Sequence, residues 1–117
     1  MLRTRLAIVA LIGAALVIVA PASAAVPTLK ATDGPGFTIT LKKGTTKVTK
    51  LKAGKYKIVV RDLSALHNFH LTGPGVNKKT GVTAKGTFTW TVTLKKGTYK
   101  FLCDPHAAIM KGSFKVT

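Results

Sequence analysis

The sequence predicts an all-β fold, a sandwich or barrel of about seven or eight short strands, for the part of the chain after residue 25. Apolar and polar residues alternate with a period of two over several runs rich in threonine, valine, isoleucine and aromatic residues. Such residues suit a pleated sheet that is buried on one face. Glycine-containing turn signals at residues 33–36, 43–44 and 73–75 separate these runs, and nothing in this part resembles a long helix.

The alternating runs locate the predicted strands. In chain order they cover residues 37–41, 55–60, 87–94 and 99–103. Trp90 lies inside the third run between apolar alternate neighbours, so we expect it to pack in the core. We expect at most one turn of helix, near residues 107–109.

Two segments of the chain, residues 51–57 and 94–100, are similar. Each has a glycine turn followed by a tyrosine that enters a strand. A duplicated functional site is one interpretation. We favour a repeated structural device of the kind found at Greek-key corners, because the chain is too short for a repeat architecture.

The N-terminal segment has the layout of a secretory signal peptide. Two arginines precede an apolar run over residues 6–20, and the small residues 21–25 follow in an Ala-x-Ala pattern. We therefore predict a signal peptide over residues 1–24, cleaved after Ala24, and a mature domain of residues 25–117. An uncleaved membrane anchor is the alternative, although the apolar run is shorter than the roughly 20 residues that span a bilayer. This export predicts a location in the periplasm, at the cell surface or in the medium.

The charge of the chain is strongly positive. It has 19 lysines and arginines against three acidic residues, all aspartates, for a net charge of +16. This balance favours an acidic protein partner or an anionic surface of the cell envelope, and we expect no nucleic acid partner for an exported protein. Many of the lysines alternate with apolar residues, so a solvated sheet face accounts for most of them. Because the chain has so few carboxylates that could act as a general acid or base, we expect that the protein is not an enzyme.

A group of soft metal ligands lies near the end of the chain. Cys103, the single cysteine, is followed by His106 and Met110, and the other two histidines, His67 and His70, lie in one upstream segment. An unpaired cysteine in an exported protein indicates intermolecular pairing, a reactive thiol or a metal. A thiolate with imidazoles and a thioether favours copper. Zinc could use the same ligands, but the thioether would add little for it.

These residues resemble a known site. His67-Asn68 and the run from Cys103 through His106 to Met110 are similar to the type I copper site of cupredoxins of the plastocyanin, pseudoazurin and amicyanin kind. The resemblance covers about residues 54–116, and it implies a Greek-key β-sandwich that holds one copper ion near one end. By position it implies that His67, Cys103, His106 and Met110 are the metal ligands. It also implies that Asn68 ties the two ligand loops together by hydrogen bonds.

The sequence offers a second candidate for the first histidine ligand and a candidate exit for electrons. His70 is a rival to His67 as the first ligand, although alternation along a strand would keep the two from facing the same ion. The resemblance also implies that electrons leave through His106. An apolar collar around that exit would be formed by Leu66, Pro74, Ala107, Ala108 and Ile109.

Three classes of function follow from these observations. The first is an exported, monomeric electron carrier that cycles one copper ion between Cu(I) and Cu(II) and docks to an acidic redox partner protein. The second is a copper-binding, buffering or delivery protein of the cell envelope. The third is an interaction module without a metal, whose basic surface grips anionic envelope polymers.

Overall fold

A computed structural model of the chain describes residues 9–19 and 25–117. The predicted cleavage site after Ala24 lies outside the described residues, as do the first eight residues of the predicted signal peptide. Residues 9–19 form neither helix nor strand, and their apolar side chains are exposed. Among the described residues, no helix is long and apolar enough to cross a membrane.

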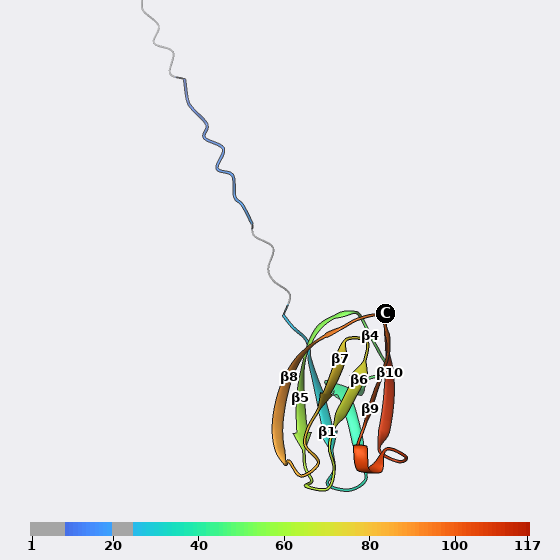
Figure 1. The fold of residues 1–117 in the computed structure, drawn as a ribbon. Coiled ribbons are helices and arrows are strands. Elements are labelled where there is room, and N and C mark those ends of the chain that lie inside the picture. The colour runs from blue at the N-terminus through green and yellow to red at the C-terminus, as the bar shows by residue number, and fades with distance from the viewer. Residues whose placement is uncertain (1–8, 20–24) are drawn as a thin grey trace, which may run out of the picture.

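Two five-stranded sheets face each other and enclose the core (Figure 1). The first sheet has the order β3(Thr46–Lys47), β2(Ile39–Lys43), β1(Thr28–Asp33), β5(Gly54–Asp62), β8(Gly86–Leu94). The second has the order β4(Lys50–Leu51), β10(Lys111–Val116), β9(Gly97–Leu102), β6(His70–Gly73), β7(Val76–Lys79). The predicted all-β sandwich is confirmed, and both sheets are mixed, because β1 pairs parallel to β5 and β10 pairs parallel to β4.

The period-two pattern has the expected structural cause. Along β5, the side chains of Tyr56, Ile58 and Val60 are buried in the core, whereas Lys55 and Lys57 are exposed. The four predicted strands correspond to β2, β5, β8 and β9 with shifted ends. The strand number exceeds the prediction because β3 and β4 have two residues each, too few to show a period.

Local expectations about tyrosine and tryptophan also hold. Trp90 packs against the core at an intermediate exposure. The Tyr56 hydroxyl donates to the Lys52 carbonyl at 2.7 Å, and the Tyr99 hydroxyl accepts from the Lys95 amide at 2.9 Å. Each tyrosine therefore fixes the backbone four residues upstream, which supports the structural interpretation of the repeated segments.

Strand directions gather the functional loops at one end of the sandwich, here called the ligand end. β1, β5 and β9 all finish there, while β6 and β10 begin there, since His70 and Lys111 both lie opposite Leu102. The loops after β1, β5 and β9 are therefore neighbours in space although they are far apart in the sequence. The opposite end carries the β2–β3 turn, β4 and the C-terminus.

Candidate metal centre

Three of the predicted ligands converge at the ligand end. The Cys103 sulfur lies 3.7 Å from Nδ1 of His67 and 3.6 Å from Nδ1 of His106, and the two Nδ1 atoms are 3.0 Å apart. A point equally distant from these three atoms lies about 2 Å from each, which is the distance at which an imidazole nitrogen binds a metal ion such as zinc. Cys103 and His67 are buried, and His106 is partly exposed. Two segments of the chain thus present one thiolate and two imidazoles to a common point.

The loop that carries Cys103 is closed by its own backbone. The Cys103 amide donates to the Met110 carbonyl at 3.0 Å, and the Met110 amide donates to the His106 carbonyl at 2.8 Å. Between them lies the 3-10 turn η1(Asp104–His106). The single helical turn thus lies three residues before the expected residues 107–109, because Pro105, in the first turn of η1, favours an earlier start. Residues 107–109 form a hydrogen-bonded turn directly after it. Met110 is fully buried at the end of this loop.

The loop that carries His67 is held close to the end of β1. A Cβ atom on Gly34 would lie 3.4 Å from Cδ2 of His67 and 3.0 Å from the Cβ of Ser64, and Gly34 has a φ of +74°. Both the space and the backbone conformation therefore require glycine there. Asp62, buried at the end of β5, accepts from the Ser64 amide at 3.2 Å and from the Thr80 hydroxyl at 3.2 Å. These contacts fix the start of the His67 loop.

A buried asparagine joins the two loops, as the resemblance implies. The Asn68 side-chain amide donates to Oδ2 of Asp104 at 2.7 Å and to the Thr80 carbonyl at 3.2 Å. Its carbonyl accepts from the Asp104 amide at 2.7 Å. The Asn68 backbone amide also donates to the Cys103 sulfur at 3.5 Å. Such contacts orient a ligand and tune its donor strength.

His70 is turned away from the three donors. Its Nδ1 lies 2.8 Å from Oδ1 of Asp104 and its Nε2 lies 2.7 Å from Oδ1 of Asn77. Burial alone would raise the pKa of Asp104, but the hydrogen bonds from His70 and Asn68 lower it below its usual value. His70 therefore supports the carboxylate that Asn68 contacts, and the choice of His67 over His70 agrees with the geometry.

The surface around His106 differs in part from the predicted collar. Leu66 is 71% exposed and Ile109 is 66% exposed, and both belong to the ligand loops. Pro74 does not belong there, because β6 carries it to the opposite end, where its carbonyl accepts from the Tyr99 hydroxyl at 2.7 Å. The prediction for Pro74 is therefore wrong.

Phe37 takes a place that the sequence did not predict. Its ring meets the imidazoles of His67 and His106 edge-on, with centroid distances of 5.4 and 4.9 Å, and the side chain is 62% exposed. It comes from the loop after β1, outside both ligand segments. No motif marks such a residue, because its contact depends on how three loops meet.

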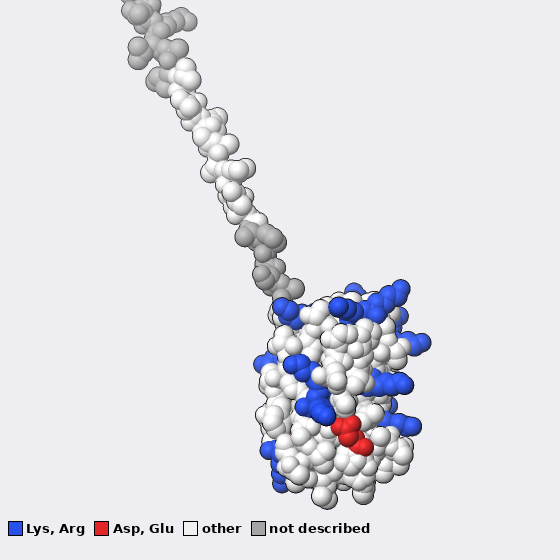
Figure 2. Space-filling view, in the orientation of Figure 1, with Lys and Arg blue, Asp and Glu red and all other residues white. Residues whose placement is uncertain are grey.

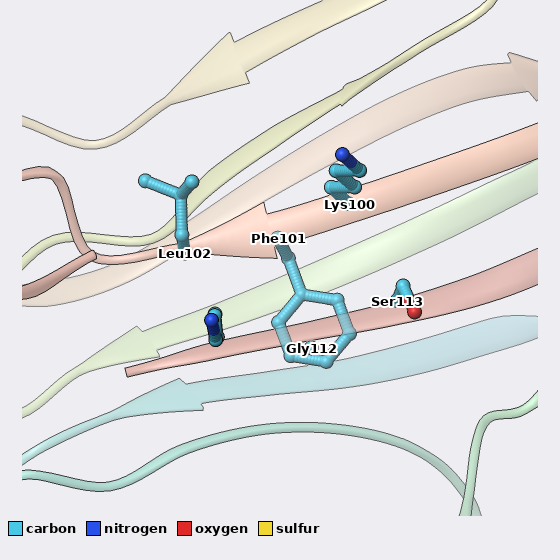
Figure 3. A pocket seen from close by; sticks show the side chains of 6 residues that line it. Lys100, Phe101, Leu102, Gly112 and Ser113 are labelled. Atoms are coloured by element: carbon cyan, nitrogen blue, oxygen red, sulfur yellow. The ribbon is translucent and has the colours of Figure 1, made fainter. Parts of the chain in front are cut away.

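A shallow pocket of about 510 Å³ lies over β9 and β10 beside the ligand loop (Figure 3). None of the three converging donors lines it. The Phe101 ring points across to Gly112, where a Cβ atom would overlap the ring at 2.2 Å. On its other side Phe101 stacks on Phe69, which directly follows Asn68, with a centroid distance of 5.4 Å. Gly112 thus lets the aromatic layer beneath the ligand loops pack closely.

The donor set fits copper. A soft thiolate with two imidazoles is the trigonal set of type I copper sites, and two of the three donors are buried. No carboxylate belongs to the converging group. The three residues form a ligand set of the type I kind, with copper as the cofactor that they fit.

Known structures share the fold. Reduced rusticyanin is 20% identical with a TM-score of 0.58, and the match covers 82% of each chain. Reduced auracyanin from Roseiflexus castenholzii is 22% identical with a TM-score of 0.56, covering 80% of this chain and 99% of that one. An oxidised amicyanin mutant is 18% identical with a TM-score of 0.51, covering 76% of this chain and 81% of that one. At these identities the likeness shows the fold alone.

Comparison at the level of sequence identifies the family. No curated protein matches the sequence. The model of the cupredoxin-like domain matches residues 8–116, nearly the whole chain. The chain therefore belongs to the cupredoxin-like family.

Proposed function

We propose that this protein is a small blue copper protein that carries single electrons outside the cytoplasm. The observation that carries the proposal is the preformed triangle of Cys103 sulfur and two imidazole nitrogens, with all separations below 4 Å. Copper would supply the couple between Cu(I) and Cu(II). The chain would supply ligands held in one arrangement, so that little has to move when the charge of the ion changes.

The four ligands in this proposal are His67, Cys103, His106 and Met110. The thioether of Met110 would act as the weak axial ligand, since the residue is fully buried at the closing end of the Cys103 loop. Two contacts support a fixed geometry. Asn68 ties the two ligand loops, and the closed backbone of residues 103–110 prevents His106 from moving independently of Cys103.

Electron exchange is proposed to pass through the exposed edge of His106. This imidazole is the most exposed of the three converging donors, and exposed Phe37, Leu66 and Ile109 lie on the loops around it. An apolar surface of this kind suits brief docking to a redox partner protein. The excess of lysine would steer an acidic partner, so the association rate should fall as salt is added.

An enzymatic role is not part of the proposal. Asp33 and Asp62 are buried, and Asp104 is engaged by Asn68 and His70. The chain has no other carboxylate side chain that could act as a general acid or base. A monomeric carrier exported by the predicted signal peptide of residues 1–24 accounts for these features without further chemistry.

The first test adds one equivalent of Cu(II) to the protein and records visible absorption and EPR spectra. We expect intense blue absorption with a narrow copper hyperfine splitting, lost in Cys103→Ser and retained in the matched control His70→Gln. Repeated reduction and reoxidation should return the full blue absorption. Binding without blue absorption would instead favour copper buffering or delivery, and no binding would contradict the metal site.

The second test concerns Met110 and export. Met110→Leu should keep the blue absorption but change the reduction potential, because the axial ligand tunes it. An unchanged potential would remove Met110 from the ligand set. Mass spectrometry of the protein recovered outside the cytoplasm should give a chain that begins at Ala25, and a full-length chain in the membrane would favour the anchor.

A further inference from the structure

A basic groove lies at the end of the sandwich that is remote from the ligands. Two adjoining depressions of about 530 and 370 Å³ share Lys43, Lys50 and Leu51 as lining residues. Lys52 lines the first and Lys47 the second. We use the term basic groove for this continuous surface and its four lysines, Lys43, Lys47, Lys50 and Lys52.

The strands explain why these lysines meet. Lys43 is the last residue of β2 and pairs with Thr46 of β3, next to the pair formed by Lys42 and Lys47. Lys50 belongs to β4 and pairs with Lys115, one residue before the end of β10. All of these positions belong to the opposite end as defined above. Figure 2 shows blue side chains at that upper end and along the sides of the sandwich, whereas the lowest part of the molecule is largely white.

The charge of the groove is not neutralised. All three acidic residues of the chain, Asp33, Asp62 and Asp104, lie at the ligand end. Among the residues that the structure describes, the single ion pair joins Asp104 to His70. Each of the four groove lysines is exposed. Four ammonium groups lie around a concave surface that no acidic side chain approaches, and they raise the local concentration of anions. The terminal carboxylate of Thr117, which also lines the first depression, offsets one of these four charges.

The shape and residue type indicate the class of ligand. Lysines are compact point charges that suit phosphate groups, whereas planar bidentate recognition would call for arginine. A groove with lysines along its length fits a linear polymer better than it fits a flat membrane surface. We propose that the basic groove binds a linear polyanion with phosphate groups along its backbone, such as a phosphate-bearing polymer of the cell envelope.

This binding would have a consequence for electron transfer. Because the groove and the metal site lie at opposite ends, a bound polymer would leave Phe37, Leu66, His106 and Ile109 free to meet a partner. The proposal does not depend on the copper chemistry. It would survive a failed copper test, and the copper site would survive failure of the groove.

The experiment titrates linear inorganic polyphosphate into protein expressed from the 117-residue sequence, without added copper. Affinity is measured by calorimetry at several salt concentrations. The groove variant is Lys43→Gln, Lys47→Gln and Lys50→Gln combined. The matched control is Lys57→Gln, Lys78→Gln and Lys100→Gln combined, which removes the same charge from strands outside the groove. Cooperative urea unfolding, followed by the fluorescence of Trp90, shows that both variants are folded.

We expect the groove variant to bind at least about tenfold more weakly at low salt, with the control close to the original protein. By analogy with single-stranded polyanions, each lost phosphate contact should reduce the slope of log affinity against log salt by about 0.7, or about 2 for three lysines. Equal losses in both variants would overturn the proposal in favour of diffuse charge. Tighter binding to vesicles of anionic lipid, unaffected by the groove variant, would overturn it in favour of a membrane surface.

Discussion

The contact of Asn68 with Asp104 offers the sharpest test of how the site is built. Replacing Asn68 with alanine removes three side-chain hydrogen bonds from a residue that is 1% exposed. Two of them join neutral groups and are worth about 1 kcal/mol each, and the one to the Asp104 carboxylate is worth about 1.5–3 kcal/mol when buried. Asp104 is 38% exposed, so solvent weakens that bond.

We therefore expect Asn68→Ala to lower the free energy of unfolding of the copper-free protein by about 3 kcal/mol. That is a large part of the 5–15 kcal/mol typical of small proteins. At about 4 °C or more per kcal/mol, the melting temperature should fall by at least about 12 °C. Copper affinity should fall too, because the two ligand loops are no longer tied.

The assay is urea unfolding followed by the fluorescence of Trp90, the single tryptophan, which packs near Phe69 at a ring distance of 6.3 Å. The matched control is Asn77→Ala, which removes one exposed contact to His70 and should cost about 0.5 kcal/mol or less. A loss below about 1 kcal/mol for Asn68→Ala, equal to that of the control, would refute the reasoning.

Three further changes probe other parts of the molecule. Phe37→Ala should raise the rate of electron exchange with a small oxidant such as hexacyanoferrate several-fold at little cost in stability, because the ring covers two imidazoles yet is 62% exposed; an unchanged rate in stopped-flow measurements would show that the ring shields nothing. Gly112→Ala should cost about 1–3 kcal/mol in urea unfolding, because its Cβ would overlap the Phe101 ring, whereas Gly36→Ala, with open space around it, should cost far less. Burial and the nearby Asp62 carboxylate raise the pKa of Asp33 from 3.8 to about 7, so the folded protein holds a proton that the unfolded chain lacks between about pH 4 and 7. The free energy of unfolding should fall as the pH rises through that window, and Asp33→Asn should abolish this fall; an identical pH profile in the variant would assign the dependence to another group.

The sequence predicted the long strands because each has enough residues to show a period. β5 and β8 have nine residues each, and their alternation is visible from composition alone. β1 was harder to recognise, because its buried positions include Asp33, a residue that sequence patterns place outside the core. Two-residue strands such as β3 and β4 are defined only by their partners.

The converging donors were predictable because rare residue types lay close together in the sequence. Their supports were less so. Phe37 reaches the site from a third loop. Thr80 accepts a hydrogen bond from Asn68 and donates one to Asp62, and it is brought there because β7, which it follows, pairs back onto β6. The prediction placed Pro74 beside the metal site because it is close to His70 in the sequence. Strand β6 lies between the two residues and carries Pro74 to the other end of the sandwich.

The position of β10 in the second sheet constrains when the protein can fold. This last strand lies between β4 and β9, so residues 50–51 gain their partner only after residues 115–116 have been made. Contacts between segments so far apart form late and slowly. A chain still emerging from a ribosome or an export channel would therefore hold His67 and even Cys103 without the sheet that brings them together. For the exported carrier proposed above, acquisition of the metal would follow release of the chain, so the chain would take up copper that is available outside the cytoplasm.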